Sequence, residues 1–401
     1  DTTGTFIQKQ TMAPKRRNSK KTAKVSSSKR RCTTSASIKE EEEDEISALT
    51  TNTNDFNVDN NDDELPTPSQ LSEVLCMIVS TRYSCDEALG ALDRLIQWAE
   101  EKNPEFLETF NTYGGVVKVI DFLETTMLDM NCVGNIRMEC IQKAAHVLRL
   151  VCSLRHDGSN KEIVTKIATC VMNYNGIDTL IDASDEYSGG DDILQVQALE
   201  CVWAALATLS CKRDAMENII IKDKANILFD TGIDILFQLK YKDVATSVLG
   251  NVFVTLCNIV GCQQYGYVEK KQFQDTTILS KCLDVFRKDN GMWGGRSEPV
   301  TDKAIQFILC CHNTELLDLD DDYEMLLPFL AMCLKKFGSI QRILESVVFL
   351  IHRACDTIDD MKIIERSGIM EPLGALLASN DINEAQKKRV HDVIVTIVTT
   401  R

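Results

Sequence analysis

Residues 361–377 read MKIIERSGIMEPLGALL, which is a short amphipathic segment, a glycine at position 368 and then a segment rich in leucine. Hydrophobic residues recur in both segments at intervals of three and four, the spacing of one face of an α-helix. A residue without a Cβ atom between them permits a tight turn. The stretch therefore predicts two short helices joined at Gly368.

The same junction recurs three more times, because Gly115, Gly176 and Gly232 each precede a segment rich in leucine, isoleucine or valine. The last interval, from Gly232 to Gly368, is close to three units of about 45 residues, and helical repeats have periods of about 40–47 residues. Two degenerate units, around residues 276–286 and 323–334, fit this interval. A longer amphipathic helix is predicted after each junction, at residues 137–154, 194–210, 244–260, 300–311, 340–355 and 384–398. No single unit can cover its own apolar face, so neighbouring units are expected to stack around one core.

This pattern resembles the armadillo-repeat family, with the best match at residues 361–377 and coverage of roughly residues 105–400. The resemblance implies an all-α, armadillo/HEAT-like right-handed α-solenoid, which we assign to residues 70–401. It also implies that the third helix of each unit lines a concave groove that binds extended peptides. In the importin-α branch these helices carry Trp-x-x-x-Asn, where the asparagine holds the peptide backbone and the tryptophans sandwich Lys and Arg side chains.

The sequence departs from that branch. Four residues after Trp203 the motif requires asparagine, but Ala207 is found there, and four residues before Asn258 it requires tryptophan, but Val254 is found there. Trp203 and Asn258 are still the candidate groove-lining residues. Alanines beside Trp203 leave room for a ligand chain, and tryptophan is enriched among binding hot spots. Two interpretations of Trp203 stay open: it lines the groove, or it packs into the core between repeats.

Residues 1–69 are predicted to form a disordered tail, since they contain few apolar residues to offset the entropy of ordering. The tail contains a basic block at residues 15–31 and an acidic block at residues 40–45. The basic block resembles a bipartite nuclear-import signal, which predicts binding to an import receptor and a location in the nucleus, the cytoplasm or both. The alternative is a solvated basic arm that has no receptor or that touches nucleic acid non-specifically. The residues of the candidate signal are Lys15, Arg16, Arg17, Lys20, Lys21, Lys29, Arg30 and Arg31.

No catalytic, cofactor or metal site is predicted. The phosphate-binding loop, the GxSxG and HExxH motifs and the GxGxxG fingerprint are all missing from the sequence. The sixteen cysteines are spread along the chain without a CxxC pair, which favours reduced, buried thiols. The acidic cluster at residues 318–322 lacks the glycine and the terminal glutamate of a calcium loop and is interpreted as the start of a helix. No membrane span is expected, because no run of about 18 uncharged apolar residues occurs.

These observations predict a non-catalytic scaffold that binds a segment of a partner protein in a groove between helices. The net charge of −16 favours basic partners and disfavours direct binding of nucleic acid by the folded part. Two alternatives remain: an adaptor subunit of a ubiquitin ligase or chaperone system, and a divergent nuclear-import receptor.

Overall fold

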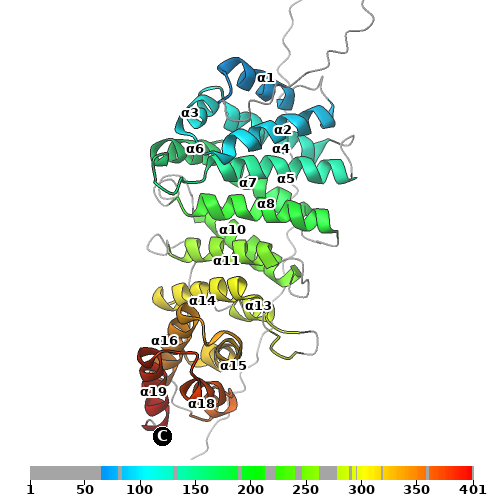
Figure 1. The fold of residues 1–401 in the computed structure, drawn as a ribbon. Helices are drawn as coiled ribbons and strands as arrows, with labels where there is room; N and C mark the ends of the chain where they lie inside the picture. The colour runs from blue at the N-terminus through cyan, green and yellow to red at the C-terminus, as the bar shows by residue number, and fades with distance from the viewer. Residues whose placement is uncertain are drawn as a thin grey trace, which may run out of the picture. The chain divides into compact units, whose positions relative to one another are not determined.

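The computed structural model describes residues 65–79, 84–129, 134–187, 192–212, 222–239, 246–261, 278–288, 291–294, 296–317, 319–357 and 361–399. Within these ranges the regular structure is helical, apart from an isolated antiparallel bridge between Arg287 and Trp293. Residues 62–401 form one unit, and the helices described here belong to it (Figure 1). The predicted all-α class is therefore confirmed.

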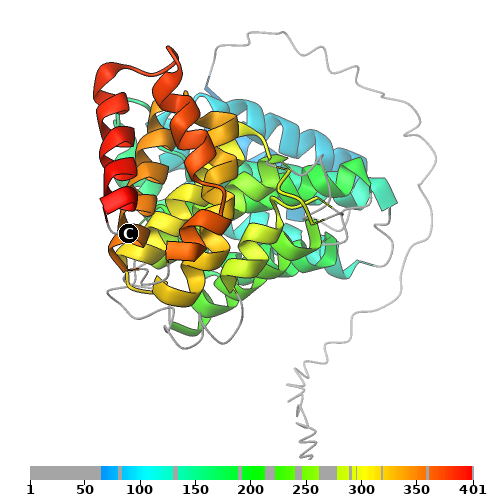
Figure 2. The ribbon, with the colours of Figure 1, turned by 90° about the horizontal axis from the view of Figure 1, so that it is seen from below.

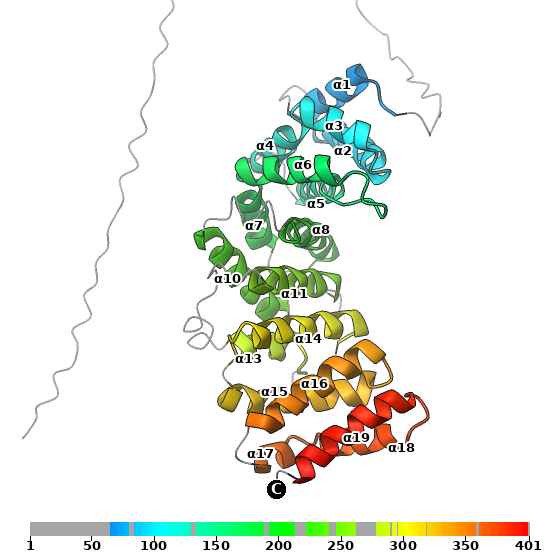
Figure 3. The same ribbon diagram turned by 90° about the vertical axis from the view of Figure 1, so that its left-hand side faces the viewer.

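Fourteen of the described helices form two ladders, which Figure 3 separates most clearly at α4, α7 and α10 on one side and α5, α8 and α11 on the other. The α1 ladder consists of α1 (Pro68–Val79), α4 (Gly115–Leu128), α7 (Gly176–Tyr187), α10 (Lys222–Leu239), α13 (Ile278–Asp284), α15 (Leu319–Phe337) and α18 (Met370–Ala378). The α2 ladder consists of α2 (Cys85–Glu100), α5 (Gly134–Val151), α8 (Ile193–Ser210), α11 (Thr246–Gly261), α14 (Glu298–Asn313), α16 (Gln341–Thr357) and α19 (Glu384–Thr399). Every helix packs against the next one in its own ladder.

The two ladders are joined because helices that follow one another in sequence also pack across them, as α4 does on α5 and α7 on α8. Three further helices complete the described structure: α3 (Pro104–Thr112), α6 (Lys161–Asn173) and α17 (Met361–Arg366). The view along the stack shows successive units overlying one another (Figure 2). This arrangement is the armadillo/HEAT-like α-solenoid that the sequence predicts. The six predicted third helices correspond to α5, α8, α11, α14, α16 and α19, each within three residues at both ends.

Local signals in the sequence explain where several helices begin. Ser84 accepts a hydrogen bond from the backbone of Glu87, whose carboxylate accepts one from the backbone of Ser84 in return. This reciprocal pair satisfies backbone N–H groups that the first turn of α2 leaves without helical partners. At the start of α3 the side chain of Asn103 accepts a hydrogen bond from the backbone N–H of Glu105 at 2.9 Å, and Pro104 follows at a position where its missing N–H is not needed.

One continuous core runs through the stack, from Leu71 in α1 to Ile397 in α19. Leucine, isoleucine, valine and alanine dominate it, and fully burying one such larger side chain contributes about 1.5–3 kcal/mol. The predicted burial of cysteine is confirmed for Cys140, Cys152 and Cys333, among others, whereas Cys76 and Cys211 are exposed. Burial raises the pKa of the Cys152 thiol to about 12, so this cysteine stays protonated and behaves as a small hydrophobic residue.

The glycine junctions are only partly as predicted. Gly368 has a φ angle of 73°, in the left-handed region, and the predicted turn is confirmed there. At the second junction the left-handed residue is Asn175, with a φ of 59°, and Gly176 begins α7 instead. A Cβ atom on Gly176 would lie 2.6 Å from a methyl group of Val171, so this glycine is needed for close packing rather than for the turn.

The prediction of a turn at Gly232 is wrong. Gly232 lies inside α10, which continues unbroken from Lys222 to Leu239. A Cβ atom at this position would approach a methyl group of Leu256 in α11 to 2.9 Å. The glycine therefore permits close contact between the two ladders, a role that a sequence pattern cannot distinguish from a turn.

The acidic cluster behaves as predicted where the structure describes it. Helix α15 begins at Leu319, so Asp320, Asp321 and Asp322 fall in its first turn. Negative charge at the start of a helix interacts favourably with the helix dipole. Asp318 lies outside the described residues.

Candidate functional site

A pocket of about 400 Å³ opens on the α2 ladder, where α5, α8 and α11 run side by side. Its lining comes from the three neighbouring helices and from residues that follow α2, α5 and α8. The lining residues are Lys102, Arg149, Leu150, Ser153, Ala204, Ala207, Thr208, Cys211, Asn251 and Val254. We call this the α5/α8/α11 pocket.

Helical spacing places these residues on the outward side of each helix. The lining residues Ala204 and Ala207 of α8 and Cys211, directly after it, follow one another at intervals of three and four, the spacing of one helix face. The methyl groups of the two alanines reach only a short distance from the helix. The surface is therefore hollow over α8, while the longer side chain of Arg149 from α5 borders the hollow.

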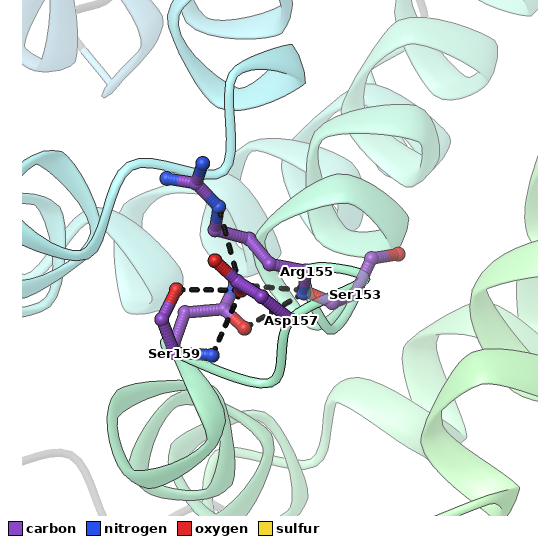
Figure 4. Close-up of polar contacts among 5 residues, drawn as sticks. Ser153, Arg155, Asp157 and Ser159 are labelled. Carbon is purple, nitrogen blue, oxygen red and sulfur yellow. Dashed lines mark hydrogen bonds and ion pairs between the residues drawn. The ribbon is translucent and has the colours of Figure 1, made fainter.

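The loop after α5 contributes Ser153 to the pocket lining, and Figure 4 shows polar contacts within this loop. Asn160, which is almost fully buried, accepts a hydrogen bond from the backbone N–H of Arg155 at 2.8 Å and donates one to the carbonyl oxygen of Ser153 at 3.2 Å. Asp157 accepts two bonds from Ser159, at 3.0 and 2.8 Å, and closes a second turn in the loop. These bonds connect residues on both sides of the loop to one another.

The charged residues of the pocket lining are both cations, Lys102 and Arg149. Within the described part of the chain, neither of them forms an ion pair with a carboxylate. Arg149 instead donates a hydrogen bond to Nε2 of His146 at 2.7 Å. Burial, together with the positive charge of Arg149, lowers the pKa of His146 below its usual range, so the ring is neutral at pH 7 and can accept this bond.

The pocket lining also contains the side-chain amide of Asn251 in α11. This amide has no hydrogen bond to any residue that the structure describes, although the backbone carbonyl oxygen of Asn251 accepts one from the hydroxyl group of Thr255 at 3.0 Å. A side-chain amide offers both donors and an acceptor, which suits the backbone of a peptide. Arg149 and Asn251 thus present polar groups to the same hollow from two helices.

The groove-lining interpretation of Trp203 is wrong, and the alternative of a core tryptophan is correct. Trp203 is fully buried, and its indole N–H donates to the hydroxyl oxygen of Ser184 in α7 at 2.9 Å. The tip of its ring also approaches Gly232 of α10. The side chain therefore points towards the α1 ladder, and the small residues around it in sequence line the pocket without it.

Asn258, the second candidate, is half-buried on the outward side of α11, four residues after Val254 of the lining. Its amide donates to Ser210 at 3.0 Å and to the sulfur of Cys211 at 3.1 Å, both beyond or at the end of α8. Asn258 therefore ties α11 to α8 at the border of the pocket. Whether it touches a partner stays a prediction.

A second pocket, of about 240 Å³, lies on the α1 ladder between α15 and α18. Its lining includes Lys335 and Lys336 but also Glu371 and Asp381. The ammonium group of Lys335 lies 3.9 Å from the carboxylate of Glu371. We call this the α15/α18 pocket.

The remaining predictions about sites concern other parts of the chain. The eight basic residues of the candidate import signal lie outside the described residues, as does the acidic block. Among the described residues, no three His, Cys, Asp or Glu side chains converge as they would around a metal ion. Helix α8 is long and apolar enough to cross a membrane by length and composition alone, but most of it is buried, as expected for a core helix.

Arg149 and Asn251 were missed by the sequence analysis. A polar residue at a helical position is common in any amphipathic helix, and neither residue belongs to a motif. One signal in the sequence could have indicated this surface. Glu200 is the charged residue of α8 and therefore marks its outward face, and Ala204, Ala207 and Cys211 follow it at helical intervals on the same face.

Comparison with known proteins gives a similarity of fold only. No family model matches the chain, and no curated protein matches it in sequence. Among solved structures, the chain is similar to a designed armadillo repeat protein, with 14% identity over 82% of this chain and 99% of that chain, at a TM-score of 0.41. The assignment of the fold rests on the helix packing described above.

Proposed function

We propose that the protein is a non-catalytic interaction scaffold that binds an extended segment of a partner protein across α5, α8 and α11. The observation that carries this proposal is the α5/α8/α11 pocket, where small side chains leave a hollow and polar groups from two helices point into it. Sites that bind ligands are typically hollow, with a few convergent polar groups that fix orientation. The resemblance to armadillo repeats supports the same surface.

We further propose that an acidic side chain of the partner enters this pocket. The net charge of the protein predicts basic partners, and residues 65–401 do contain 33 Lys or Arg against 48 Asp or Glu. At short range, however, the charges of the pocket lining affect a ligand more than the net charge of the protein does, because the field of distant surface charges is screened over about 8–10 Å. A carboxylate between Lys102 and Arg149 would give both cations the partner that the described fold does not provide.

The backbone of the bound segment has a separate anchor in this proposal. The amide of Asn251 can donate to a peptide carbonyl oxygen and accept from a peptide N–H, and these bonds are independent of the partner's sequence. Affinity would thus come from the backbone and from burial over the alanines, while the preference for an acidic residue would come from Arg149.

The proposal is tested by cross-linking from inside the pocket. A photoreactive phenylalanine analogue at Thr208, in the lining, should cross-link to one segment of a partner in an extract of the cells that express the protein, and the same analogue at Thr165 of α6 should not. The mapped segment is then synthesised, and its affinity is measured for the unmodified protein. A segment without Asp or Glu would contradict the acidic preference, and equal cross-linking from both positions would contradict the site.

Charge reversal separates the pocket from general electrostatics. Arg149→Glu should weaken binding of the synthetic segment at least tenfold, which corresponds to about 1.4 kcal/mol. The matched control is Arg366→Glu, an exposed position in α17 that changes the net charge by the same amount. Equal losses for the two variants would show that the overall charge, and not this pocket, determines binding.

We also propose that the basic block at residues 15–31 carries the protein into the nucleus. The support is the sequence alone, namely clusters of Lys and Arg of the kind that import receptors bind. Alanine at Lys15, Arg16, Arg17, Lys29, Arg30 and Arg31 should move a fluorescent fusion from the nucleus to the cytoplasm. Nuclear fluorescence that persists in this variant would rule the proposal out.

A further inference from the structure

Two cysteines from neighbouring helices of the α2 ladder lie in contact on its outward side. The sulfur atoms of Cys257 in α11 and Cys310 in α14 are 3.1 Å apart. Both residues are half-buried, so a small oxidant or reductant can reach them. Cys311, the next residue in sequence, faces the core and is only 1% exposed.

The geometry is close to that of a disulfide. A disulfide has an S–S length of about 2.05 Å, so the two sulfur atoms have to approach by about 1 Å. The two side chains already touch, so this movement is small. Helices α11 and α14 are also direct neighbours in the ladder, which keeps the two thiols together.

We propose that Cys257 and Cys310 form a reversible disulfide that fastens α11 to α14 when hydrogen peroxide oxidises the protein. The two S–H bonds break, one S–S bond forms, and the thiols lose two electrons and two protons. The O–O bond of the peroxide breaks and takes up these electrons and protons, which gives two molecules of water. A dithiol reductant reverses the reaction by thiol–disulfide exchange.

The bond would lie next to the proposed binding surface but does not depend on it. Cys257 follows Val254 of the α5/α8/α11 pocket by three residues on α11, on the outward side of that helix. A disulfide between residues 53 positions apart also removes conformations from the unfolded chain. The oxidised protein should therefore hold two neighbouring units together more firmly than the reduced protein does.

The reaction is expected to be slow at neutral pH. Hydrogen bonding to Cys310 and burial raise the pKa of Cys257 well above its usual range, and the thiolate is the form that attacks an oxidant. The pair is thus suited to prolonged oxidative conditions, and oxidation over hours rather than seconds is the expected timescale.

The test uses the full chain, treated with hydrogen peroxide or kept in dithiothreitol, then alkylated, digested with trypsin and analysed by mass spectrometry. Peroxide should join the fragments 243–270 and 304–335, with loss of both free thiols at 257 and 310, and dithiothreitol should restore them. Fragmentation of the joined species separates Cys257 from Cys262, and Cys310 from Cys311 and Cys333, which share these fragments.

Substitutions at two adjacent cysteines identify which of them forms the disulfide with Cys257. Cys310→Ala should abolish the joined species, whereas Cys311→Ala should leave it in place, although the second substitution disturbs the core more. The proposal is overturned if the joined species survives in Cys310→Ala, or if the unmodified protein yields separately alkylated Cys257 and Cys310 after peroxide treatment. Oxidation of either sulfur to a sulfinic acid without a bond would overturn it as well.

Discussion

The α5/α8/α11 pocket and the α15/α18 pocket both contain two cationic residues, but they differ in what balances the charge. In the α15/α18 pocket, Lys335 lies 3.9 Å from Glu371, and Asp381 also contributes to the lining. In the α5/α8/α11 pocket, Arg149 has a neutral histidine as its partner, and no carboxylate of the described residues pairs with it. The lining of the α15/α18 pocket contains as many acidic as basic residues, whereas the lining of the α5/α8/α11 pocket contains basic residues and no acidic ones.

The difference shows why the overall charge is a poor guide to the partner. A protein with a net charge of −16 attracts cations at a distance, yet binding depends on the groups that lose water at the contact. A guanidinium group without a carboxylate at such a contact favours an anion. The following predictions test the two pockets and the packing beneath them, beginning with the largest expected effect.

The largest effect is expected for Trp203, whose buried ring packs between α8, beneath the α5/α8/α11 pocket, and the α1 ladder. Trp203→Ala removes a fully buried ring and leaves the hydroxyl group of Ser184 without its donor, so the free energy of unfolding should fall by about 3–5 kcal/mol. Denaturation followed by circular dichroism measures the loss. Trp203→Phe keeps most of the ring and should cost clearly less; equal costs for the two would show that the ring's volume is not what supports α8.

The α15/α18 pocket depends on a glycine in a comparable way. A Cβ atom at Gly338 would lie 2.5 Å from the carbonyl oxygen of Leu334 and 2.9 Å from methyl groups of Leu376, a residue of α18. Because backbone cannot yield easily, Gly338→Ala should destabilise the protein by about 1–3 kcal/mol. The control is Gly374→Ala in α18, which meets no atom within 4 Å and should stabilise that helix by up to about 1 kcal/mol.

A smaller effect is expected from Asn258, at the border of the α5/α8/α11 pocket. Asn258→Ala removes the hydrogen bonds to Ser210 and Cys211 at the end of α8, and a typical net contribution of one such bond is about 1 kcal/mol. Faster amide hydrogen exchange at the end of α8, with little change in α14, would match this role. Unchanged exchange at both places would show that the amide does not tie α11 to α8.

The position of the third helices could be predicted because it depends on local periodicity, and α5, α8 and α11 lie within three residues of the predicted bounds. The side on which Trp203 lies could not be predicted in the same way. Helix α8 has hydrophobic residues on nearly every side, because it packs against α5, α7 and α11. Periodicity identifies one buried face, and it fails where several faces are buried.

The contacts of the candidate site and of the neighbouring cysteine pair depend on which residues of adjacent helices lie against each other. Cys257 and Cys310 are 53 residues apart, and no spacing rule relates them. The hydrogen bond between Arg149 and His146 has a local spacing of three residues, but this spacing is shared by many exposed pairs. Only the arrangement of α5 beside α8 shows that this guanidinium group borders a hollow and has no carboxylate partner among the described residues.

The smallest predicted effect concerns the pKa of His146, which distinguishes the two pockets most directly. Burial is the main cause of its lowered pKa, and the charge of Arg149 is the second. Arg149→Met should therefore raise the pKa of His146 towards its usual value of about 6.5 without reaching it, because the burial remains. Lys335→Met, in the other pocket, should leave it unchanged. Nuclear magnetic resonance of the imidazole protons over pH 4–8 gives both values.

The sign of the pH dependence follows from the same shift. Above about pH 6.5 His146 is neutral in both the folded and the unfolded chain, so it adds no pH dependence there. As the pH falls below 6.5, the unfolded chain takes up a proton that the folded chain does not, and the folded state loses stability until the lowered pKa is passed. Arg149→Met narrows this window, because it brings the folded pKa closer to the unfolded one. The contribution of His146 to acid destabilisation should therefore be smaller in Arg149→Met than in the unmodified protein. A larger contribution in the variant would mean that Arg149 favours protonation of His146, which is incompatible with the hydrogen bond from the guanidinium group to a neutral ring.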